Sequence, residues 1–198
     1  MTTPLRLGAL QPAHRDRIAA ILRATGVFST AEVDVALELF DETFSGSGKW
    51  EAGSDGLVAE RRSPDEPFPL PASRLPPPDY SFLGAFTPEG ELVGYACFGP
   101  TPGTDRTYDL YWIAVDPAAH GAGIGTTLLS EVERRLQGQH ARLLVVETSS
   151  RSEYAPTRGF YGRRGYTEAA RVREFYAPGD DRIILTKRLQ HSPAGRGA

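Results

Sequence analysis

A glycine-rich segment between a strand and a helix constrains this chain more than any other feature. Residues 107–115 read TYDLYWIAV, and such aromatic and β-branched residues favour a strand. The sequence HGAGIGTTLL follows, and apolar residues then recur at helical spacing as far as Gln137. Gly121, Gly123 and Gly125 permit backbone conformations and close approaches that side chains would block. Amide groups at the start of a helix favour an anion, so we expect a pyrophosphate-binding loop here. A glycine-rich turn without a ligand is the alternative.

The spacing of this loop argues against two other kinds of phosphate site. No Lys-Ser or Lys-Thr pair follows the glycines, so a nucleotide-triphosphate P-loop is unsupported. A dinucleotide fold needs its first glycine directly after the strand, whereas residues 116–120 intervene here. Thr126 also stands where the third glycine of that fingerprint belongs. Glu147 does end the next strand at a suitable distance, so a nucleotide-dependent oxidoreductase remains the weaker alternative.

The rest of the chain predicts an α/β (α+β) fold around one mixed sheet of six to seven strands with four helices. The first half of this sheet is antiparallel, and a parallel strand–helix–strand crossover lies in the middle. The apolar run over residues 141–147 predicts a strand that is buried on both faces. The expected strands are 5–9, 80–86, 91–99, 107–115, 141–147, 167–176 and 182–189, and the expected helices are 12–24, 29–46, 124–137 and 156–164.

Composition excludes several classes of protein. The net charge is −3, from 22 Lys and Arg against 25 Asp and Glu, so a basic nucleic-acid binder is excluded. The single cysteine, Cys97, cannot form an internal disulfide and fits a buried apolar strand. No apolar stretch is long enough to span a membrane, and the four histidines lack metal-ligand spacing. We expect a soluble, cytoplasmic protein with no nucleic-acid, membrane or metal partner.

We expect a single domain over residues 1–190, followed by a disordered tail at 191–198. A proline-rich insertion at about 60–79 interrupts the domain, because seven of the 16 prolines fall there. Such a run cannot form a central strand or the interior of a helix. It predicts either a polyproline-like cover or a disordered insertion.

Two motifs carry a resemblance to a known family. The sequence VDPAAHGAGIGTTLL resembles the acetyl-CoA-binding motif of the GNAT N-acetyltransferase superfamily, in which a Val, four residues and a Gln or Arg precede two spaced small residues. Val115 matches the Val, His120 stands at the Gln or Arg position, and Gly123 and Gly125 match the small residues. The sequence GFYGRRGY, at 159–166, resembles the helix-to-strand segment that this family has later in the chain.

This resemblance implies an enzyme that transfers an acetyl group from acetyl-CoA, as co-substrate, to a primary amine. The acceptor would be a small molecule, an amino acid or a protein amine, and a homodimer is an expectation from the family alone. Backbone groups would bind most of the coenzyme, with the Ile113 amide donating to the acetyl oxygen, and Tyr154 stands where the family often has Asn. The implied coenzyme-binding residues are Ile113, Ala114, Val115, His120, Gly121, Ala122, Gly123, Ile124, Gly125, Thr126 and Tyr154.

Three residues are candidates for catalysis. By resemblance, Tyr161 lies near the coenzyme sulfur and donates a proton to it, although it could equally pack beside its neighbours on a short helix. Asp109 stands where some relatives have a catalytic Glu, and strand alternation predicts that it shares a face with Tyr111, Ile113 and Val115. Glu147 is the other candidate base. If none of the three acts, the alternative is a non-catalytic acyl-CoA-binding module.

Overall fold

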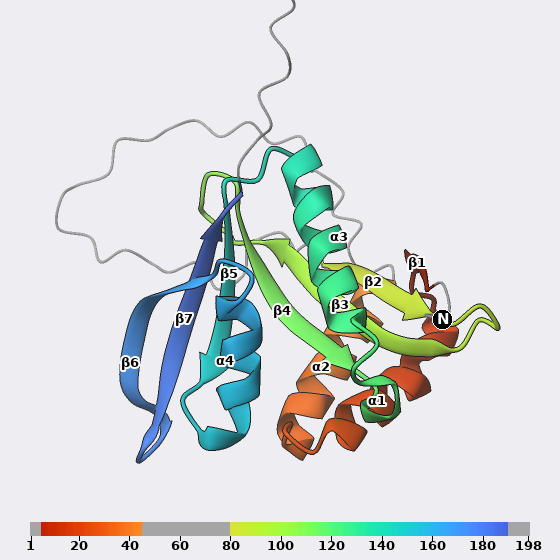
Figure 1. Ribbon diagram of the computed structural model, residues 1–198, viewed down its shortest axis with the longest axis horizontal. Helices are drawn as coiled ribbons and strands as arrows, with labels where there is room; N and C mark the ends of the chain where they lie inside the picture. The colour runs from red at the N-terminus through yellow and green to blue at the C-terminus, as the bar shows by residue number, and fades with distance from the viewer. Residues whose placement is uncertain (1–4, 45–79, 190–198) are drawn as a thin grey trace, which may run out of the picture.

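The computed structural model describes residues 5–44 and 80–189, and Figure 1 shows their arrangement. Within these ranges the chain forms one seven-stranded sheet, in the order β1-β2-β3-β4-β5-β7-β6, with four α-helices. The proline-rich segment at 60–79 and the tail at 191–198 lie outside the described residues. The strands are β1 (Arg6–Ala9), β2 (Ser81–Phe86), β3 (Leu92–Pro100), β4 (Thr107–Val115), β5 (Leu143–Ser149), β6 (Thr167–Ala177) and β7 (Asp180–Arg188), and the helices are α1 (Arg15–Thr25), α2 (Thr30–Phe44), α3 (Ile124–Gly138) and α4 (Ala155–Gly162).

The pairing of the strands confirms the predicted fold class. Only β4 and β5 run parallel, and α3 forms the crossover between them. The other neighbouring strands of the sheet are antiparallel. The order of elements is the predicted one, although β5 begins at Leu143 and continues to Ser149 instead of covering 141–147.

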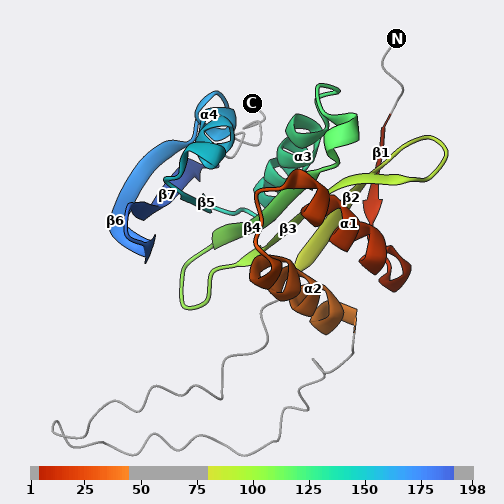
Figure 2. The same ribbon diagram turned by 90° about the horizontal axis from the view of Figure 1, so that it is seen from below.

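Helices cover the two faces of the sheet unequally (Figure 2). On one face α3 and α4 enclose an apolar cluster, here called the α3/α4 cluster, which includes Leu128, Leu144 and Tyr161. On the other face α1 and α2 enclose a second cluster, the α1/α2 cluster, which includes Ile18 and Tyr95. The strand residues of the α1/α2 cluster come from β2, β3 and β4. The half of the sheet formed by β5, β7 and β6 therefore has helices on one face only.

This unequal cover corrects the prediction that β5 is buried on both faces. Leu144 and Val146 are 0% and 3% exposed and join the α3/α4 cluster. Val145 is only half-buried and Glu147 is exposed, on the opposite face of the strand. The prediction from the apolar run is correct for one face of β5. It is wrong for the other face, because neither α1 nor α2 extends over it.

The parallel pair separates partway along its length. β4 and β5 pair only from Thr107 to Leu110 and from Leu143 to Val146. Beyond that point β4 continues to Val115 beside β3 alone, and β5 continues beside β7 alone. Figure 1 shows the two strands diverging toward α4 and α1. The facing edges of the divergent segments, here called the split, carry backbone groups without a strand partner.

A bulge in β4 changes which side chains share a face. Cys97 of β3 pairs with Trp112 and the next residue pairs with Leu110, so Tyr111 is an extra residue in β4. Ile113 and Val115 consequently contact the α3/α4 cluster, whereas Tyr111 contacts the α1/α2 cluster. The prediction that Asp109, Tyr111, Ile113 and Val115 share one face is therefore wrong.

Candidate active site

The glycine loop places a set of free amides at the start of α3. Gly121 and Gly123 have φ values of +84° and +75°, which only glycine adopts readily. The Thr127 amide makes the first helical hydrogen bond, 3.0 Å from the Gly123 oxygen. In the described part of the chain, no amide from Gly121 to Thr126 donates to another group. Together with the helix dipole, these amides suit an anionic ligand.

His120 closes this loop onto the preceding strand. Its Nε2 lies 3.1 Å from the Val115 carbonyl oxygen, so an Nε2–H group donates to that oxygen. Val115 is the last residue of β4, and its carbonyl would otherwise be unpaired at the edge of the split. His120 thereby fixes where the loop begins relative to the strand.

The edge of β4 presents further backbone groups to the split. The Asp116 amide donates to the Val93 oxygen over 2.9 Å, so the backbone groups of Asp116 face β3. Successive residues of a strand direct their backbone groups alternately to its two sides. The amides of Ile113 and Val115 therefore face away from β3, into the split. This orientation fits the predicted role of the Ile113 amide as a donor.

Tyr161 lies on the α3/α4 side of the split. Its side chain is 2% exposed and packs between Phe160 and Tyr166, with ring centroids 5.2 Å away in each case. Ile113 contacts the same cluster. Burial raises the pKa of the Tyr161 phenol, so the hydroxyl keeps its proton throughout the neutral range.

The two candidate carboxylates lie on the opposite side of the sheet and differ in their partners. Asp109 accepts a hydrogen bond of 2.7 Å from Thr101 Oγ1, and no ion pair joins it to another described residue. Partial burial raises the pKa of Asp109, and the nearby Glu147 carboxylate adds to the rise, whereas the Thr101 hydrogen bond and the Arg182 guanidinium oppose it. Glu147 instead forms an ion pair with Arg182, whose guanidinium lies 4.8 Å from the centre of the Phe175 ring.

The structure thus brings the sequence-predicted residues to one region but on two sides of it. The phenol of Tyr161 lies on the α3/α4 face of the sheet, and the carboxylate of Asp109 lies on the opposite face. The split lies between β4, which carries Asp109, and β5. Tyr154 is 8% exposed and its hydroxyl donates over 3.0 Å to the Val27 oxygen, so that donor is already used within the fold.

Two further polar side chains near the split lie outside the predicted set of site residues. Thr148 is 6% exposed, and its Oγ1 has no hydrogen-bond partner among the described residues. It follows Leu144 and Val146 on the same face of β5, a pattern visible only once the strand is known to continue past Glu147. Arg164 lies beside the start of α3, where its guanidinium donates to Thr126 Oγ1.

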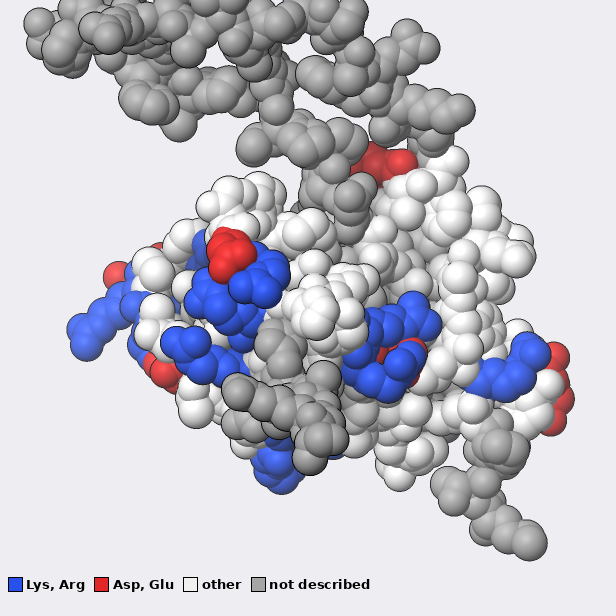
Figure 3. Space-filling view, turned by 90° about the horizontal axis from the view of Figure 1, so that it is seen from above, with Lys and Arg blue, Asp and Glu red and all other residues white. Residues whose placement is uncertain are grey.

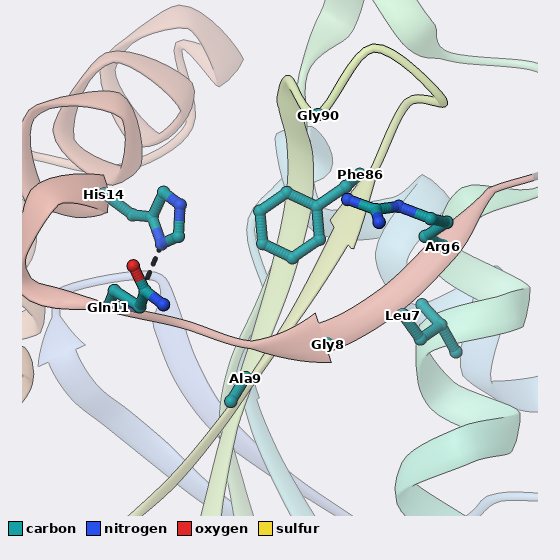
Figure 4. A pocket seen from close by; sticks show the side chains of 8 residues that line it. All are labelled: Arg6, Leu7, Gly8, Ala9, Gln11, His14, Phe86 and Gly90. Carbon is teal, nitrogen blue, oxygen red and sulfur yellow. Dashed lines mark hydrogen bonds between the residues drawn. The ribbon is translucent and has the colours of Figure 1, made fainter.

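A cavity of about 350 Å³ lies elsewhere, along the edge strand β1 (Figure 4). His14 and Phe86 lie on its wall with ring centroids 5.3 Å apart, and His14 Nδ1 accepts a hydrogen bond of 2.9 Å from the Gln11 amide. None of the predicted site residues lines this cavity. It is therefore separate from the split.

Three properties of the described residues bear on possible partners. On the face in Figure 3, Lys and Arg side chains form separate clusters that adjoin acidic side chains, not one continuous basic surface. Within residues 5–44 and 80–189, no three His, Cys, Asp or Glu side chains group as metal ligands would. No helix in these ranges is both long and apolar enough to cross a bilayer.

Comparison with known proteins identifies the family. Residues 38–166 match the model of the acetyltransferase (GNAT) family. A protein from Desulfovibrio desulfuricans, described as an acetyltransferase of this family, is 34% identical with a TM-score of 0.75, over 94% of this chain and all of that one. An acetyltransferase structure from Salmonella typhimurium, solved with its cofactor acetyl-CoA, shares the fold at 17% identity and a TM-score of 0.62, over 98% and 99% of the two chains.

An uncharacterized protein of Mycobacterium leprae is 29% identical over 170 residues, which are 83% of this chain. This chain spans 40% of the length of that relative. The family model covers well over half of the chain, and the Desulfovibrio protein aligns with nearly all of it. On this basis, the chain belongs to the acetyltransferase (GNAT) family.

Proposed function

We propose that this protein is an acetyl-CoA-dependent N-acetyltransferase, which transfers an acetyl group directly to a primary amine. One observation carries the proposal: β4 and β5 separate after Leu110 and Val146, and the split between them ends beside the free amides of the glycine loop. A coenzyme bound along the split would bring its acetyl group to the place where an amine from the other face of the sheet could meet it. Acetyl-CoA would supply the activated acetyl group as a thioester.

The residues around the split fit such a coenzyme. The amides from Gly121 to Thr126 would bind its pyrophosphate, and His120 would hold the loop in place. The backbone groups of Ile113 and the amide of Val115, which face the split, would pair with the amides of its pantetheine arm. The buried Thr148 hydroxyl lacks a partner in the described structure and could hydrogen-bond to the same arm.

Side chains on the two faces of the sheet would then act in different steps of the reaction. A bond forms between the amine nitrogen and the acetyl carbon, and the bond from that carbon to sulfur breaks. The Ile113 amide would stabilise the negative charge that develops on the acetyl oxygen. Tyr161, which is protonated at neutral pH, would give its proton to the departing sulfur. An amine that arrives as a cation loses two protons when it becomes an amide: one replaces the proton that Tyr161 gave to sulfur, and the other leaves through the opposite face.

We propose Asp109, with Glu147 as the second candidate, as the acceptor of that proton. Glu147 forms an ion pair with Arg182, whereas Asp109 forms no ion pair with a described residue and Arg182 only lowers its pKa from a greater distance. Asp109 precedes Ile113 by four residues, about 13 Å along an extended strand. Water must therefore carry the proton between the reacting amine and the carboxylate.

The uncovered half of the sheet is the side from which we propose the acceptor approaches. Glu147 and Arg182 lie there, the exposed side chains of Phe175 and Tyr176 are on β6, and Tyr111 lies on the same face of the neighbouring β4. Burial raises the pKa of both Tyr111 and Tyr176, and the Glu147 carboxylate adds to the rise, so these rings lie near the carboxylate. Aromatic rings beside carboxylates suit the cationic form in which a primary amine arrives.

The test is release of free coenzyme A thiol when the purified protein, acetyl-CoA and a panel of primary amines are combined. The proposal predicts thiol release that depends on at least one amine and yields the acetylated product by mass spectrometry. Binding of acetyl-CoA with no amine-dependent release across small amines, amino acids and peptides would contradict it. That outcome would support the non-catalytic acyl-CoA-binding module instead.

A further inference from the structure

Arg164 is held at the start of α3 by contacts from two helices. Its guanidinium carbon lies 3.7 Å from the centre of the Phe160 ring, and Nη1 donates to the Phe160 carbonyl oxygen over 2.8 Å. Nη2 donates to Thr126 Oγ1, in the first turn of α3. Phe160 also packs beside Gly125, since a Cβ at that glycine would lie 3.5 Å from the ring. The guanidinium is thus fixed next to the glycine loop.

These contacts leave the charge of Arg164 without a counterion. No carboxylate among the described residues forms an ion pair with it, and its Nε is buried without a hydrogen-bond partner. A cation that is partly removed from water is unfavourable unless an anion lies near it. The adjacent amides from Gly121 to Thr126 also lack acceptors. Two sets of donors therefore lie side by side, and both are suited to an anion.

We propose that Arg164 binds a phosphate group of the coenzyme and completes the anion site that the loop amides begin. This inference rests on the proposed function for the identity of the ligand. Arginine suits this position because its planar group can stack on Phe160 and still direct N–H groups at phosphate oxygens. The phosphate is either part of the pyrophosphate or the 3′-phosphate of the ribose, and the choice of ligand in the test separates these sources.

The experiment compares wild-type protein with Arg164→Gln, Arg164→Lys and Arg163→Gln. Arg163 is the matched control, because it is the adjacent residue of the same type and its side chain is exposed. Affinities for coenzyme A and for dephospho-coenzyme A, which lacks the 3′-phosphate, are measured by calorimetry. Affinity for pantetheine, which has no phosphate, is measured by NMR titration at millimolar concentrations.

For Arg164→Gln we expect coenzyme A to bind about 10- to 100-fold more weakly, the effect of losing one charge-assisted hydrogen bond. Pantetheine should bind as it does to wild type, and Arg163→Gln should leave all three affinities unchanged. Arg164→Lys should recover part of the loss, because it restores the charge. An equal loss for dephospho-coenzyme A assigns Arg164 to the pyrophosphate, and no loss assigns it to the 3′-phosphate.

Two results would overturn the inference while leaving the proposed function intact. One is wild-type affinity of Arg164→Gln for coenzyme A. The other is an equal loss of affinity for coenzyme A and for pantetheine, because that would mean that Arg164 stabilises the end of α4 and does not bind a phosphate. Failure of the wild type to bind any of the three ligands would instead overturn the proposed function, and this inference with it.

Discussion

The Nε2 atom of His120 lies 3.1 Å from the carbonyl oxygen of Val115, five residues earlier in the chain. This contact explains how histidine can stand where related sequences have Gln or Arg. His120 provides an N–H donor that reaches back to the end of β4, and the side chains of Gln and Arg also carry N–H donors. The contact also links the glycine loop to the edge of the split.

His120→Ala should weaken the binding of acetyl-CoA by about fivefold, the usual effect of losing one neutral hydrogen bond. The loss follows because the Val115 carbonyl is left unpaired and the loop amides are no longer fixed to the strand. His120→Gln keeps a donor and should bind nearly as well as wild type. Calorimetric titration compares the three proteins, and equal affinity of the Ala variant would show that the contact does not position the loop.

Two alanine substitutions test whether the glycines of the loop are needed for their backbone conformation or for the space that a side chain would fill. Gly123→Ala places a Cβ on a residue with φ +75°, which costs about 1–2 kcal/mol of folding free energy and should displace the loop amides. Gly125 has an ordinary φ, and the Cβ added by Gly125→Ala would lie at a normal contact distance of 3.5 Å from Phe160. Thermal unfolding and acetyl-CoA titration should show losses for Gly123→Ala and little change for Gly125→Ala. Equal losses would contradict this interpretation.

Tyr161→Phe removes only the hydroxyl that we propose as the proton donor. Turnover should fall by about 100-fold, the lower range for loss of a general acid, while acetyl-CoA affinity stays close to wild type. Stability should change little, because the ring contacts with Phe160 and Tyr166 remain. Tyr166→Phe is the control, since its hydroxyl bonds Glu133 at 3.0 Å, in the same cluster. Unchanged turnover of Tyr161→Phe would remove this residue from the mechanism.

Asp109→Asn tests the proposed base through its pH dependence. The wild-type rate should rise with pH as the Asp109 carboxyl loses its proton, at a pH above the usual range because its pKa is raised. The Asn variant should lose at least 10-fold in kcat/KM and also lose this rise, while Glu147→Gln should keep it. A wild-type pH profile in the Asn variant would show that the base lies elsewhere.

The same substitution has a predictable effect on stability. A folded-state pKa above the unfolded value means that the fold favours the protonated carboxyl. Wild type therefore loses stability as the pH rises through the pKa that Asp109 has in the folded protein. At pH values below the pKa of Asp109 in the unfolded protein, this loss is absent. Asp109→Asn should unfold at the same or a higher temperature than wild type at pH 7, with the difference vanishing under acid conditions. Lower stability of the variant at pH 7 would contradict this sign.

Much of this architecture could be predicted from local sequence patterns. Periodicity and glycine positions indicate the strands and helices in their correct order, and the strand–loop–helix motif indicates where an anion would bind. The face of Asp109 could not be predicted, because alternation assumes a regular strand and the extra residue at Tyr111 arises from pairing with β3. The open face of β5 depends on where α1 and α2 pack, which an apolar run does not specify.

The same limit applies to site residues outside the predicted set. Arg164 is 38 positions from the predicted Thr126 in the chain, and only the packing of α4 beside α3 brings the two together. Strand alternation predicts that Thr148 faces the α3/α4 cluster only if β5 is known to continue past Glu147. Patterns within one segment identify the loop, whereas contacts between segments determine which side chains complete the site.

Calorimetric titration of the purified protein with acetyl-CoA, with NADH titrated in parallel, is the most direct test of the proposed coenzyme site. We predict micromolar binding of acetyl-CoA and no binding of NADH, because the free amides of the loop and the open edge of β4 fit a pyrophosphate that continues into a pantetheine arm. Absence of acetyl-CoA binding would contradict the assignment of the split as a coenzyme site, and with it the roles proposed for Tyr161 and Asp109.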